Sequence, residues 1–85
     1  MSFASLAQIV QDAIEQEQED GDGENFDAIT QLGGAMSIEL SEIGSSKASS
    51  AWHSLQTAAL DGDLRAVVKN WKTIKKEVNA KLERV

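Results

Sequence analysis

One histidine, His53, is the side chain best suited to acid–base chemistry in this 85-residue chain. Histidine exchanges a proton near neutral pH more readily than other residues, so general acid–base catalysis or transient phosphorylation would involve His53. The chain has no cysteine, which excludes thiolate nucleophiles, disulfides and thiolate metal sites within it. No serine has a plausible activating base beside it in the sequence, and a single histidine is a weak basis for a catalytic triad.

The segment around His53, Ala-Trp-His-Ser-Leu-Gln-Thr at residues 51–57, resembles the His-x-Leu-Lys-Gly core of histidine-phosphotransfer domains, which are helical bundles. The resemblance implies that His53 would carry a phosphoryl group. Gln56 replaces the lysine of that core and Thr57 replaces the glycine, and 32 residues follow His53, too few for the remaining helices of such a bundle. We expect a surface histidine and keep phosphotransfer as an alternative function.

The acidic segment Asp-Gly-Asp-Gly-Glu-Asn at residues 20–25 resembles the opening of an EF-hand calcium loop. Carboxylates occupy the first three ligand positions: Asp20, Asp22 and Glu24. Asn25 replaces the glycine of position 6, and Gln31 stands at position 12, where a calcium loop needs a bidentate glutamate. We therefore expect a solvated acidic loop at residues 20–25, and no bound metal or cofactor.

Acidic and basic residues are segregated along the chain. Residues 1–46 hold ten acids and no Lys or Arg, whereas residues 61–85 hold seven bases and four acids; the formal net charge is −6. A net negative charge repels phosphates, so we expect no direct binding of nucleic acid. An acidic helical protein can instead imitate the phosphate array of a duplex and block a nucleic-acid-binding protein, which we keep as a second alternative function.

Apolar residues at steps of three and four predict two helices in the first half of the chain. The first runs from Phe3 to about Glu19 with Ser2 as its N-cap. We expect its acidic end to project or fray, because acids oppose the helix dipole there. The second begins near residues 25–26 and is interrupted by Gly33-Gly34. This pair either kinks the helix or admits the close approach of another backbone.

Two further helices are predicted in the second half. Gly44-Ser45-Ser46 ends the second helix, and a third apolar stripe follows at residues 48–59; one continuous helix over residues 26–60 is the alternative. Asp61-Gly62-Asp63 is a turn with a ready N-cap. The strongest stripe then runs from Leu64 to Val85.

These elements predict an all-α fold. No stretch alternates with period two as a strand does. We expect a single domain over residues 1–85, a small helical bundle of about four helices, with a long helical hairpin that dimerises as the alternative. The apolar runs are far shorter than the roughly 20 residues needed to span a bilayer. With no signal-peptide pattern at the N-terminus, we expect a soluble cytoplasmic protein that does not bind membranes.

A core this small leaves little room for an enclosed substrate pocket, so we expect no enzyme. The predicted function is a non-enzymatic protein-binding module: an adaptor, chaperone, inhibitor or assembly subunit. It would dock another protein, or a second copy, through the apolar face of the last helix or the small-residue face of the second, where serines recur from Ser37 to Ser49. The two tryptophans are expected as core anchors, with an interface role as the alternative. The residues expected to contact a partner are Val68, Trp71, Val78, Trp52, Glu15, Glu17 and Glu19.

Overall fold

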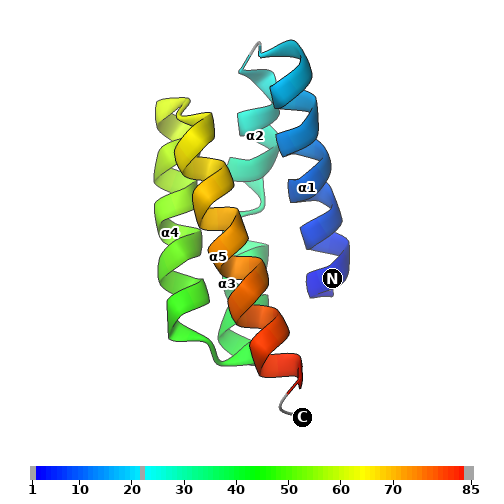
Figure 1. Cartoon of the computed structure of the whole chain (residues 1–85), viewed down its shortest axis with the longest axis vertical. Coiled ribbons are helices and arrows are strands. Elements are labelled where there is room, and N and C mark those ends of the chain that lie inside the picture. The colour runs from blue at the N-terminus through cyan, green and yellow to red at the C-terminus, as the bar shows by residue number, and fades with distance from the viewer. Residues whose placement is uncertain (1, 22, 84–85) are drawn as a thin grey trace.

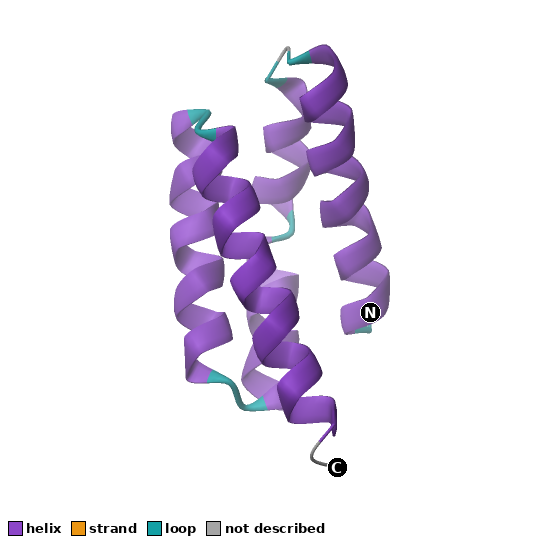
Figure 2. Ribbon diagram, in the orientation of Figure 1, coloured by secondary structure: helices purple, strands orange, loops and turns teal. Residues whose placement is uncertain are grey.

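Five helices make up the computed structural model, which describes residues 2–21 and 23–83 (Figures 1 and 2). They are α1 (Phe3–Asp20), α2 (Glu24–Gln31), α3 (Gly33–Ile43), α4 (Ser46–Asp61) and α5 (Leu64–Glu83). No strand occurs in these two ranges. The predicted all-α bundle is confirmed, but the number of helices is five rather than about four.

The chain runs along the long axis of the bundle four times (Figure 1). α1, α4 and α5 each form one leg, and α2 and α3 follow one another in the same direction as the second leg. The fifth helix therefore arises from a break within one leg of an up-and-down bundle. The bundle measures 40 × 21 × 20 Å. In Figure 1 the first turn of α1 lies well short of the end where α3 and α5 finish.

The core consists of the predicted apolar stripes, which face one another inside the four legs. Each helix contributes buried side chains, because residues three and four apart share one face of a helix. The largest fully buried ones are Leu6, Val10, Ile29, Met36, Leu40, Leu55, Val67, Ile74 and Val78. Aliphatic residues thus fill most of the interior, as the low aromatic content predicts.

The alternative of one helix over residues 26–60 is wrong, and the long helical hairpin is wrong with it. α2 ends at Gln31 and α3 begins at Gly33. The chain breaks again at Gly44, whose φ of 84° lies in the left-handed region that favours glycine. Ser45 then caps α4, because its hydroxyl accepts a hydrogen bond from the Ala48 N–H at 3.1 Å.

The glycine pair interrupts the helix, which confirms one of the two expectations, but the groups that approach Gly33 are side chains of α4 rather than another backbone. Gln56 of α4 donates to the Ile29 carbonyl at 2.8 Å, and the Trp52 indole N–H donates to the Gly33 carbonyl at 3.1 Å. A Cβ atom at Gly33 would lie 3.0 Å from Oε1 of Gln56. α4 therefore packs against the backbone where α2 ends.

The remaining ends carry the predicted caps, with one correction. Ser2 accepts from the Ser5 N–H at 3.3 Å, and Asp63 accepts from the Ala66 N–H at 3.2 Å. The acidic end of α1, however, does not fray. It continues to Asp20 and is capped by the left-handed Gly21. The predicted acidic loop at residues 20–25 is therefore too long, because Asp20 belongs to α1 and Glu24 and Asn25 belong to α2.

The two glycines at the break provide a stability test. Gly34 is exposed, and no atom beyond its own stretch of helix backbone lies within 4 Å of the position that a Cβ would occupy. Gly34→Ala should therefore stabilise the fold by roughly 0.5 kcal/mol through reduced backbone freedom of the unfolded chain. Gly33→Ala should lose part or all of that gain, because its methyl group would push against Oε1 of Gln56, whose side-chain nitrogen donates to the Ile29 carbonyl. Urea unfolding of both variants measures the difference, and equal stabilisation by both would show that the close approach is unimportant.

Candidate functional site

The apolar residues expected to contact a partner lie mainly in the core. Trp52, Trp71 and Val78 are buried, and Val68 is half-buried. The apolar stripe of the last helix is therefore the inner face of α5 and is covered by the rest of the bundle. This burial corrects the expected docking face, because these side chains are not accessible to a partner in this structure. The expectation that the tryptophans anchor the core is confirmed.

Both buried indoles satisfy their polar N–H group, as buried tryptophans usually do. The Trp71 N–H donates to Oε1 of Gln11 at 2.9 Å, and Gln11 in turn donates to Glu15 at 3.2 Å. The Phe3 ring lies 6.5 Å from the Trp71 ring, and the Lys75 ammonium lies 5.9 Å from its centroid. These contacts connect α1 to α5. Glu15 lies at the solvent-exposed end of this series of hydrogen bonds.

Glu17 is a structural residue rather than part of an exposed acidic row. It is 5% exposed, whereas Glu15 and Glu19 are exposed. Both of its carboxylate oxygens lie 3.1 Å from the Gly23 N–H, and one also accepts from Asn25 Nδ2 at 3.1 Å. The carboxylate thus sits at the N-terminus of α2, where the helix dipole favours a negative charge. Its position on the apolar stripe of α1, three residues after Ile14, was the sequence signal for burial.

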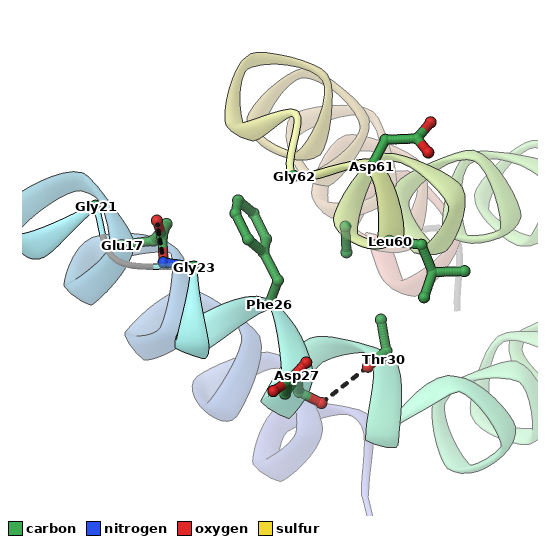
Figure 3. Close-up of a pocket in the computed structure, with 10 residues that line it drawn as sticks. Glu17, Gly21, Gly23, Phe26, Asp27, Thr30, Leu60, Asp61 and Gly62 are labelled. Atoms are coloured by element: carbon green, nitrogen blue, oxygen red, sulfur yellow. Dashed lines mark hydrogen bonds between the residues drawn. The ribbon is translucent and has the colours of Figure 1, made fainter.

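An open recess of about 410 Å³ lies between the α1–α2 turn and the α4–α5 turn (Figure 3). Phe26 points from α2 into the space between the two turns, and the exposed acids Asp27 and Asp61 lie on its walls. Among the residues that the structure describes, no three His, Cys, Asp or Glu side chains are grouped so that they could hold a metal ion. Asp22, one of the three carboxylates of the calcium-like segment, lies outside those residues.

A second recess, the α3–α5 groove, lies at the opposite end of the bundle. Its lining residues are Glu39, Glu42 and Ile43 of α3 and Lys81 and Leu82 of α5, and its volume is about 410 Å³. Leu82 is 58% exposed, although it continues the stripe that is buried at Val78. The reason is the position of α1, whose first turn lies short of this end (Figure 1).

Ile38 adds a second exposed aliphatic side chain beside this groove. It is 63% exposed and precedes Glu42 by one helical turn, on the side of α3 opposite the buried Met36 and Leu40. Ile38 was not identified from the sequence, because the prediction considered the apolar stripe on the inner side of this helix and Ile38 is a single apolar residue on the outer side.

The other sequence candidates are at the surface. His53 is exposed on α4, and its carbonyl accepts a hydrogen bond from the Thr57 hydroxyl at 3.2 Å. The recurring serines lie mainly at the surface: Ser37, Ser41 and Ser49 are exposed, and among these four only Ser45 is buried, as the cap of α4.

Comparisons of the chain with protein-family models, curated proteins and solved structures find no match. Within the described ranges, no helix is both long enough and apolar enough to cross a membrane. The functional assignment therefore depends on the surface of the molecule itself.

The role of Glu17 can be separated from that of its acidic neighbours. Glu17→Gln should destabilise the fold by roughly 1–2 kcal/mol, because an amide replaces one of the carboxylate oxygens that accept from Gly23. Glu19→Gln removes the same charge from an exposed position and should change stability by less than about 0.5 kcal/mol. Urea unfolding measures both values, and equal effects would contradict a structural role for Glu17.

Proposed function

We propose that the protein is a non-catalytic protein-binding module that docks through the α3–α5 groove. The observation that carries this proposal is the exposure of Leu82, which lines the open groove together with Ile43, and of Ile38, which lies beside it. Adaptors, chaperones, inhibitors and assembly subunits all act in this way.

The energetic argument concerns the aliphatic surface left in water. Burying such surface contributes about 25 cal/mol per Å², and this contribution is available only to a partner that covers it. Single exposed aliphatic residues are ordinary, whereas contiguous exposed apolar surface is typical of interaction sites. Leu82 lines the groove, and Ile38 lies one helical turn before Glu42, which also lines it. The groove is also lined by the charged residues Glu39, Glu42 and Lys81, and many protein interfaces likewise combine apolar and polar residues.

This surface replaces the docking face expected from the sequence. The expected contacts were inner residues of the last helix, such as Trp71 and Val78, which the bundle covers. The groove uses the next turn of the same helix, at Leu82, together with the end of α3.

A capture experiment tests the proposal. Immobilised wild-type protein and the Ile38→Ser/Leu82→Ser double variant are exposed to a lysate of the source organism at about 0.5 M salt, which screens surface charges. The wild type should retain a specific protein that the double variant does not, because the variant lacks the aliphatic contacts. Leu60→Ser is the matched control, since Leu60 is 77% exposed on α4. Equal retention by the wild type and the double variant would contradict docking at the groove.

The exposed acids of α1 favour a second candidate function, imitation of a nucleic-acid backbone. Asp12, Glu15 and Glu19 are exposed and lie on one side of the helix, being three and four residues apart. In this case duplex DNA should compete with the protein for a basic partner. The Glu15→Gln/Glu19→Gln variant, with Glu17 intact, should bind that partner more weakly at low salt. Unchanged binding by this variant would contradict the mimicry.

A further inference from the structure

The surface around the α3–α5 groove combines a protrusion and a hollow. Ile38 projects from α3 with 63% of its surface exposed, and the hollow beside it is lined by Ile43 and Leu82. At about 100° per residue, Ile38 lies about 40° around the helix from Glu42, which belongs to the groove. A partner that covers this surface must therefore offer both a hollow for Ile38 and a protrusion for the groove.

The two walls of the groove carry opposite charges. The α3 wall bears Glu39 and Glu42, and the α5 wall bears Lys81. α3 contains no basic residue, so the groove has an acidic side and a basic side.

We propose that the occupant of the α3–α5 groove is a second copy of this chain, an inference that rests on the proposed function of the groove. In a dimer with two-fold symmetry, the same patch meets itself and every contact occurs twice. Ile38 of each copy enters the groove of the other and contacts Ile43 and Leu82. Glu42 of each copy then faces Lys81 of the other.

Self-complementarity favours a second copy over an unrelated partner. A two-fold interface requires one patch that is complementary to itself, and this patch carries both charge signs and both a protrusion and a hollow. A second copy therefore supplies every complementary feature, whereas an unrelated partner would have to carry the same combination on its own surface.

The size of the patch predicts a weak dimer. Stable interfaces bury about 800 Å² per partner, whereas this patch offers two exposed aliphatic side chains. The net charge of −6 on each copy also opposes association. We therefore expect a dissociation constant in the micromolar range or weaker, with rapid exchange between monomer and dimer.

Analytical ultracentrifugation of the full chain, from about 10 µM to 1 mM, measures this equilibrium. Ile38→Ser and Leu82→Ser should each weaken dimerisation by at least about tenfold, since each removes a central apolar contact. Leu60→Ser should leave the dissociation constant unchanged. All three residues are exposed, so circular dichroism should show intact helices in each variant.

A charge exchange tests the pairing of the walls. Glu42→Lys and Lys81→Glu should each be monomeric, because like charges then face one another across the two-fold axis. An equimolar mixture of these two variants should associate again. In the mixed dimer, the new basic side chain of the Glu42→Lys copy faces the new acidic side chain of the Lys81→Glu copy, and the other pair is the native one. Mixing does not alter either monomer, so recovery in the mixture arises only from contacts between copies.

Three results would overturn the inference. The first is a wild-type protein that stays monomeric at every concentration. The second is a dimer whose dissociation constant is unaffected by Ile38→Ser and Leu82→Ser. The third is a mixture of the two charge variants that fails to associate. Loss of the dimer with retention of groove-dependent capture of another protein would leave the proposed function standing. Loss of both would remove the proposed function as well.

Discussion

Two buried indole N–H groups determine how the helices sit against one another. Trp52 donates to the Gly33 carbonyl in the second leg, and Trp71 donates to the Gln11 side chain in α1. A buried indole must cover a large ring and also satisfy its N–H, so each tryptophan allows few relative positions of its neighbours. The α4–α5 hairpin is thereby positioned against both other legs.

This positioning explains why the two ends of the bundle differ. With Trp71 bonded to Gln11 near the middle of α1, the first turn of α1 lies short of the end where α5 finishes (Figure 1). The last apolar turn of α5 is then uncovered, and the α3–α5 groove results. The proposed docking surface is thus a consequence of how the core is packed.

Charge acts within the molecule as well as on its surface. Glu17, near the end of α1, turns inward, and its carboxylate accepts from the N–H of Gly23, the N-cap of α2. Buried carboxylates require such partners, whereas exposed ones are solvated by water. Glu15 and Glu19 therefore remain available for contacts that Glu17 cannot make.

The sequence by itself determined four helical segments, their approximate ends and their inner stripes, but not the division of the second segment into α2 and α3. These features depend on local chemistry: the spacing of apolar residues, the hydroxyl caps at Ser2 and Ser45, and the left-handed glycine at Gly44. Only the tertiary structure decided which members of a stripe are covered. Val78 and Leu82 lie four residues apart on the same apolar stripe of α5, yet Val78 is buried and Leu82 is exposed. Burial of a side chain depends on whether another helix extends as far as that turn. The periodicity of one helix does not show how long the neighbouring helices are or where they lie along the bundle axis.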